Sequence, residues 1–108
     1  MSNRNLNDMQ NIVEEMIKKY DLDSPVELRY IDLTSEIGEL GKEILKSSNY
    51  GKTNFEKTED LKLEIGDVLF SLICTANCLD IDLSEALDNV LEKYNKRFSE
   101  KGNIGSGN

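Results

Sequence analysis

Apolar residues recur along this chain at the three- and four-residue spacing of an amphipathic helix, and no stretch alternates steadily between apolar and polar positions. The pattern predicts four helices, at about residues 5–20, 25–47, 56–79 and 83–99. The apolar stripe of the second helix consists of Leu33, Ile37, Leu40 and Ile44, and that of the last helix of Leu83, Leu87, Val90, Leu91 and Tyr94. The sequence therefore predicts an all-α fold, most simply a small four-helix bundle without a sheet.

Capping residues mark where two of these helices begin. The segment Ser24-Pro25-Val26-Glu27 is typical of a capping box, with Ser24 as the N-cap and proline at the first helical position. Asp82 is expected to cap the last helix in the same way. We expect a single helical domain over residues 1–100, because the glycine-rich segment 101–108 lacks helical periodicity and is expected to form a flexible tail.

The composition narrows the possible partners and chemistry. The 108 residues carry a formal net charge of −8, which argues against a nucleic-acid polymer or an anionic membrane as the main partner. No apolar run approaches the roughly 20 residues of a membrane span, and the first residues lack the apolar core of a signal peptide, so we expect a cytoplasmic protein. The sequence has no histidine, so carboxylates are its main chemical resource.

The two central helices contain an internal repeat. The segment DLTSEIGEL at 32–40 lies over DLKLEIGDV at 60–68, and five of the nine positions are identical. Each copy places two carboxylates three residues apart, and therefore on one side of its helix. Helices joined by a short loop normally run antiparallel as neighbours, so four carboxylates are expected to converge across one seam. They are Glu36, Glu39, Glu64 and Asp67.

These four carboxylates are expected to need a counter-charge. Carboxylates gathered without a cation repel one another, and their pKa values rise. A hard divalent cation removes this conflict, and Mg²⁺ prefers carboxylate and phosphate oxygens. The alternative is that each pair is only a solvated helix face. The matched registers favour a metal site, with Mg²⁺ as the expected cofactor and Mn²⁺ as a second possibility.

Each copy of the repeat also holds a glycine between its carboxylates, Gly38 and Gly66. A glycine within a helix costs about 1 kcal/mol relative to alanine. Its presence at two equivalent positions predicts that the two backbones approach each other closely there.

Three stretches around the repeat carry a family resemblance: LTSEIGELGKEIL at 33–45, EIGDVLFSLICTANCLDID at 64–82 and EALDNVLEKYNKRF at 85–98. They resemble the MazG-like nucleotide pyrophosphohydrolases, whose signature is E-x-x-E followed by E-x-x-D. The resemblance implies an all-α MazG-like bundle completed as a dimer or a pair of dimers. It also implies Mg²⁺-dependent hydrolysis of nucleoside triphosphates, NTP or dNTP, between the α and β phosphates, with the monophosphate and pyrophosphate as products.

The resemblance also assigns roles to particular residues. It makes Lys93 and Arg97 the basic pair of the last helix, which stand one turn apart and can hold substrate phosphate oxygens. Pairing with a surface carboxylate such as Glu92 or Glu100 is the alternative for these two cations. The metal ligands and catalytic groups, one of which would orient the attacking water, are the four carboxylates Glu36, Glu39, Glu64 and Asp67.

Two rival functions remain open from the sequence. One is an enzyme of the phosphoribosyl-ATP pyrophosphatase type, which has related helices. The other is a non-catalytic helical dimer module, in which the carboxylates only solvate a seam. A homodimer built largely through the central helices is expected, because Leu69, Phe70 and Ile73 lie away from the stripe of their helix and a single chain would leave some of that surface exposed to solvent.

Overall fold

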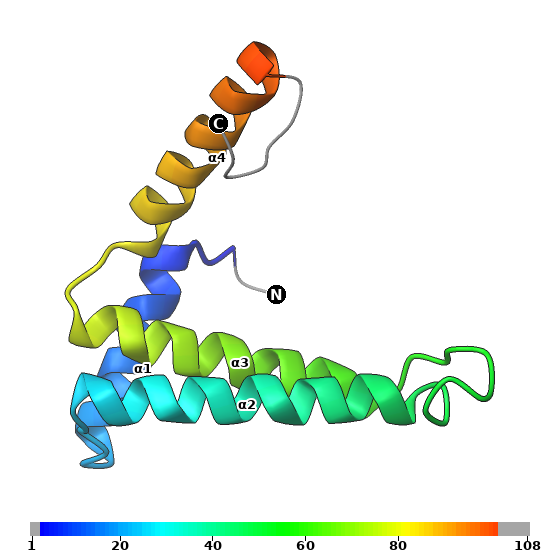
Figure 1. Cartoon of the computed structure of the whole chain (residues 1–108). Helices are drawn as coiled ribbons and strands as arrows, with labels where there is room; N and C mark the ends of the chain where they lie inside the picture. The colour runs from blue at the N-terminus through cyan, green and yellow to red at the C-terminus, as the bar shows by residue number, and fades with distance from the viewer. Residues whose placement is uncertain (1–2, 102–108) are drawn as a thin grey trace.

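The structure, a computed structural model, describes residues 3–101 and contains four helices in that part of the chain (Figure 1). They are α1 (Leu6–Lys19), α2 (Val26–Lys46), α3 (Glu59–Cys78) and α4 (Leu83–Lys101). No strand occurs between residues 3 and 101, so the predicted all-α class is confirmed. Residues 102–108 of the predicted tail lie outside the described residues. None of the described helices is both long and apolar enough to cross a membrane.

Two of the helices, α2 and α3, form an antiparallel pair, and α4 projects away from it. α2 and α3 lie side by side along their length, α1 packs against α3, and α4 packs mainly against α1 and then rises away from the α2–α3 pair (Figure 1). The radius of gyration is 17.1 Å, whereas a compact domain of this length has about 13 Å. A single chain therefore leaves an open angle between α3 and α4.

The core lies between α1 and α3. Its buried members are Val13 and Ile17 of α1 with Ile73 and Cys74 of α3, and Phe70 packs against them. Leu69, Phe70 and Ile73 were the residues considered for solvent exposure in a single chain. Ile73 and Phe70 pack against α1, whereas Leu69 is 44% exposed. α2 contributes no buried residue at all.

One face of the α2–α3 pair is apolar and open to solvent. Ile37 is 52% exposed and Ile65 is 56% exposed, although both belong to apolar stripes. A hollow of about 490 Å³ opens on the pair beside Ile44 and Ile65. A second hollow, of about 340 Å³, lies where α3 meets α4 and is lined by Leu6, Leu69, Leu72, Leu83, Ala86, Leu87 and Val90. More large apolar side chains of the described residues are therefore exposed than buried.

The two predicted caps have different outcomes. The Asp82 cap is confirmed, since its Oδ1 accepts a hydrogen bond of 3.0 Å from the backbone N–H of Glu85. Hydrogen bonds from Glu85 and from the side chain of Asn7 hold the pKa of Asp82 below its usual range. The Ser24 cap is wrong: Pro25 is the N-cap and makes no side-chain cap bond. Pro25 is extended, with φ −62° and ψ 152°, which puts the start of α2 one residue beyond the reach of Ser24.

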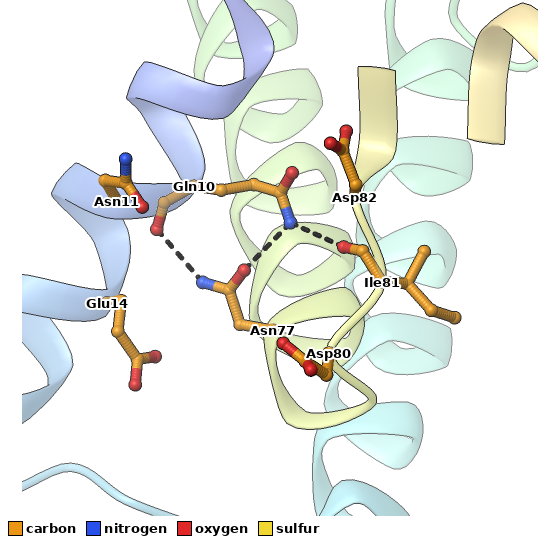
Figure 2. Close-up of a pocket in the computed structure, with 7 residues that line it drawn as sticks. All are labelled: Gln10, Asn11, Glu14, Asn77, Asp80, Ile81 and Asp82. Atoms are coloured by element: carbon orange, nitrogen blue, oxygen red, sulfur yellow. Dashed lines mark hydrogen bonds between the residues drawn. The ribbon is translucent and has the colours of Figure 1, made fainter. Parts of the chain in front are cut away.

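A buried amide network fixes the direction in which α4 leaves the core (Figure 2). Gln10 of α1 donates through Nε2 to Asn77 Oδ1 at 2.9 Å and to the carbonyl oxygen of Ile81 at 2.8 Å. Asn77 donates in return to the Gln10 carbonyl oxygen at 3.1 Å, and the first amide of α4, from Leu83, donates to Gln10 Oε1 at 2.9 Å. One side chain of α1 thus ties the end of α3 to the start of α4.

Replacing Asn77 with alanine is expected to lower the free energy of unfolding by about 1–3 kcal/mol, because it leaves buried polar groups of Gln10 without their partner. Urea denaturation followed by circular dichroism measures the change. Asn11→Ala is the matched control, since Asn11 is exposed and lines the same surface hollow as Gln10 and Asn77 (Figure 2), and it should change stability by less than about 0.5 kcal/mol. If both substitutions lowered the free energy of unfolding equally, the hydrogen bonds between Gln10 and Asn77 would not be stabilising the fold.

Candidate metal centre

Three carboxylates from the two copies of the repeat meet across the α2–α3 seam. Glu36 of α2 and Glu64 and Asp67 of α3 each offer one carboxylate oxygen, and these oxygens all lie within 4.8 Å of one another. Glu36 and Glu64 are half-buried and Asp67 is exposed. The antiparallel packing predicted from the repeat therefore gathers three of the four expected ligands.

The charges in this group are close enough to oppose one another. The pKa of Glu64 is raised, first because the carboxylate is partly desolvated and then because Asp67, Glu36, Glu39 and Glu43 place negative charge around it. Three carboxylate oxygens at this spacing fit a hard divalent cation, which binds oxygen ligands and offsets their repulsion. The donor set contains no sulfur or nitrogen, and so suits Mg²⁺ or Mn²⁺ better than zinc.

Glu39 lies outside the group of three. It follows Glu36 by one turn on α2, and its side chain is exposed. Its charge nevertheless reaches Glu64 and contributes to the raised pKa of that residue. The quartet expected from the sequence thus consists of three convergent carboxylates and one at the solvent side.

Glu43 extends this row of carboxylates, but it has partners of its own. Its Oε2 accepts a hydrogen bond of 3.0 Å from Thr58 Oγ1, and its Oε1 lies 3.7 Å from Lys46 Nζ. Thr58 is the N-cap of α3 and accepts from the amide of Leu61, so Glu43 ties the end of α2 to the start of α3. Glu43 is therefore paired with Thr58 and Lys46.

The basic pair of α4 lies apart from these carboxylates. Lys93 Nζ is 4.9 Å from the ring centroid of Tyr94, and the guanidinium carbon of Arg97 is 5.9 Å from the same centroid. α4 packs on α1 and rises away from α2 and α3 (Figure 1), so the described chain does not bring its own cations to its own carboxylates. The expected phosphate site is therefore not assembled within one chain.

The comparison with known families decides what this arrangement belongs to. The family model of the MazG nucleotide pyrophosphohydrolase domain matches residues 27–100, which include the carboxylates of the repeat and both cations of α4. The chain belongs to the MazG family. The predicted resemblance is confirmed, and the MazG protein described here is a hydrolase of the nucleotide pyrophosphohydrolase class. This outcome supports an enzyme over the non-catalytic module.

Relatives of this MazG chain match it over most of its length. The uncharacterized protein YpjD of Bacillus subtilis (strain 168) is 40% identical over 106 residues, which are 94% of this chain and 93% of YpjD. The crystal structure of B. subtilis YpjD has a TM-score of 0.72 and covers 90% of this chain and 99% of that one. The crystal structure of the Bacillus-conserved MazG protein, a nucleotide pyrophosphohydrolase, is 34% identical, has a TM-score of 0.74, and covers 87% of this chain and 93% of that one.

The two repeat glycines of the MazG domain face open space. A Cβ added to Gly38 or to Gly66 would meet nothing within 4 Å. The prediction that these glycines let α2 and α3 approach closely is therefore wrong. Each follows a seam carboxylate by two residues, which turns it about 200° around its helix and away from the neighbouring helix.

Sequence reasoning missed Gln10 and Asn77, which hold α4 in place. They are 67 residues apart, and their pairing depends on how α1 crosses α3. The available signal was an amide within the apolar stripe of α1, since Gln10 stands between Leu6 and Val13 at helical spacing.

Proposed function

We propose that this MazG protein hydrolyses nucleoside triphosphates, of the ribo or deoxyribo series, between the α and β phosphates, and releases the monophosphate and pyrophosphate. The observation that carries the proposal is the convergence of Glu36, Glu64 and Asp67 on the seam of the repeat. Mg²⁺, or Mn²⁺ in its place, is the proposed cofactor, because these oxygens suit a hard cation that also binds phosphate. The proposed location of the protein is the cytoplasm.

Each carboxylate has a proposed role. Glu36, Glu64 and Asp67 would hold the cation, and Glu39, one turn along α2, would complete the ligand set or accept a hydrogen bond from the attacking water. The bound cation supplies neutralisation of phosphate charge and a lowered pKa of bound water, so that no protein nucleophile is required. The chain's own carboxylates would orient the attacking water, and its basic side chains would hold the phosphate oxygens.

Lys93 and Arg97 are the proposed phosphate-binding cations. The guanidinium of Arg97 can bind two phosphate oxygens in parallel, whereas Lys93 acts as a point charge. The proposed assembly is a homodimer or a pair of dimers, since the apolar face of α2 and α3 is too exposed for a stable monomer surface. A nucleic-acid polymer and a membrane are not proposed as partners, because the chain carries a net charge of −8.

A substrate panel tests this function. With Mg²⁺ present, ribo- and deoxyribonucleoside triphosphates are expected to yield pyrophosphate and the monophosphate, separated by ion-exchange chromatography. Chelation with EDTA should reduce turnover to background, and Mn²⁺ should restore part of it. Release of inorganic phosphate would contradict cleavage between the α and β phosphates, and turnover of phosphoribosyl-ATP alone would establish the rival enzyme.

A further inference from the structure

The α2–α3 seam consists of positions that recur at steps of three and four residues along both helices. α2 packs along α3 (Figure 1), so the half-buried side chains of α2 mark the surface that faces α3. Polar and apolar positions alternate along this surface on both sides of the seam. Near the metal group they are Glu36, Leu40 and Glu43 of α2, and Leu61 and Glu64 of α3 with the N-cap Thr58 before them.

Two polar contacts across the seam belong to one antiparallel register. Glu36 meets Glu64 in the metal group, and Glu43 meets Thr58 through a hydrogen bond. Glu43 follows Glu36 by seven residues and Thr58 precedes Glu64 by six, so the two contacts lie roughly 10 Å apart along the helices. The layer between them is apolar and contains Leu40 and Leu61, which line one hollow.

The apolar layer does little to fix this register. Contacts between leucine side chains are non-directional, so they change little when one helix slides slightly along the other. Before a cation binds, Glu36 and Glu64 repel each other, and the repulsion favours a shift that separates them. A hydrogen bond depends on both distance and angle. The contact between Glu43 and Thr58 therefore opposes such a shift.

The Glu43–Thr58 contact is sheltered and joins the two helices directly. The side chain of Glu43 is only 13% exposed, and its Oε2 accepts from Thr58 Oγ1 at 3.0 Å. The same hydroxyl oxygen accepts from the backbone N–H of Leu61 at 3.3 Å, so the first turn of α3 is held to α2 through one side chain. The second partner of Glu43, Lys46, has a side chain that is 58% exposed, and an ion pair in that setting adds little.

We propose that Glu43 is a positioning residue of the metal centre. Its hydrogen bond to Thr58 fixes the register of α3 on α2, and so keeps Glu64 opposite Glu36 before a cation binds. Polar contacts within helix seams are well suited to this role, because they penalise a wrong register more than apolar contacts do. The inference rests on the proposed function, and it adds a residue outside the metal group that determines how tightly that group binds its cation.

Binding of Mn²⁺ alone, measured by electron paramagnetic resonance, tests the inference without catalysis. Glu43→Leu and Thr58→Val each remove the hydrogen bond, and each is expected to raise the Kd for Mn²⁺ by about 10-fold. Turnover at saturating Mg²⁺ should stay within about threefold of the wild type, because the bound cation itself draws the carboxylates together. A lower melting temperature with an unchanged Kd would reduce the contact to a structural one and overturn the inference.

Conservative substitutions separate position from charge. Glu43→Gln keeps an oxygen that accepts from Thr58, and Thr58→Ser keeps the hydroxyl, so both variants should bind Mn²⁺ within about threefold of the wild type. Lys46→Gln is the matched control on the other side of Glu43 and should change the Kd by less than about twofold. If Glu43→Gln weakens binding as much as Glu43→Leu, then Glu43 acts through its charge, and the inference is overturned.

The double variant Glu43→Leu with Thr58→Val shows whether the two residues act through one bond. It should bind Mn²⁺ about as tightly as either single variant, because each substitution removes the same interaction. Losses that multiply to about 100-fold would overturn the inference.

Comparing metal binding with turnover separates this inference from the proposed function. Weaker Mn²⁺ binding by Glu43→Leu, in a protein whose wild type releases no pyrophosphate from any triphosphate, would refute the proposed function alone. Pyrophosphate release by the wild type, together with equal Mn²⁺ affinity of the wild type and Glu43→Leu, would refute the positioning role alone.

Discussion

Replacing Glu64 with glutamine is expected to lower pyrophosphate release by about 10³-fold, because a cation that stabilises phosphate charge contributes several kcal/mol to the transition state and loses one of its anionic ligands. Glutamine keeps the volume of the side chain. The fold should therefore persist, as measured by circular dichroism. Glu59→Gln is the matched control, since Glu59 is an exposed glutamate of the same helix, and it should leave turnover within about twofold of the wild type.

The stability of the same variant distinguishes a metal ligand from a solvated carboxylate. The pKa of Glu64 is raised in the fold, so its charged form is disfavoured there, and the metal-free protein loses stability as pH rises through that pKa. Glu64→Gln removes this loss and should unfold at the same or a higher temperature than the wild type in EDTA at neutral pH. Saturating Mg²⁺ should raise the melting temperature of the wild type and raise that of the variant much less. Equal Mg²⁺ responses would argue against a metal centre at this residue.

Replacing Ile37 with aspartate is expected to convert the protein to a monomer at micromolar concentration and to lower turnover by at least about 10²-fold. Twofold symmetry places the new charge twice in an apolar interface, and an unpaired buried ion costs several kcal/mol. Sedimentation velocity measures the assembly and pyrophosphate release measures the site.

Ile31→Asp is the matched control for this prediction. Ile31 is on the same helix and is 57% exposed, against 52% for Ile37, but it lies outside the apolar stripe. It should leave assembly and turnover unchanged. The turnover of Ile37→Asp should rise more than proportionally with protein concentration, as dimers re-form. A fully active monomer would contradict the proposed interface.

The carboxylate group was predictable from the sequence because it depends on short-range geometry. Matched registers in two antiparallel helices fix which side of each helix faces the seam, and this placed Glu36, Glu64 and Asp67 together. The position of Glu39 was harder to predict, since the rotamer of an exposed glutamate is not determined by helical spacing. The same helical spacing turns Gly38 away from α3. A glycine within a helix is therefore not by itself evidence that two helices pack closely.

The direction of α4 could not be predicted from the sequence. It depends on Asp80, which adopts φ 55° two residues beyond the end of α3, and on the hydrogen bonds that Gln10 makes with chain segments more than 60 residues away. Helix capping is also hard to predict from local sequence. Ser24 and Asp82 both occupy typical N-cap positions, but only Asp82 caps its helix. Local spacing determines which residues share a face, whereas long-range contacts determine where that face points.

The small core between α1 and α3 has a consequence for folding. In the proposed homodimer, much of the apolar surface of α2 and α3 would be buried only when two chains meet, so the free energy of unfolding would depend on protein concentration. Refolding would then include a bimolecular step, which slows on dilution while helix formation within each chain does not. Newly made chains of such a dimer would expose their isoleucines to other chains until they pair, and the cellular concentration of the protein would then help to determine the fraction that is folded.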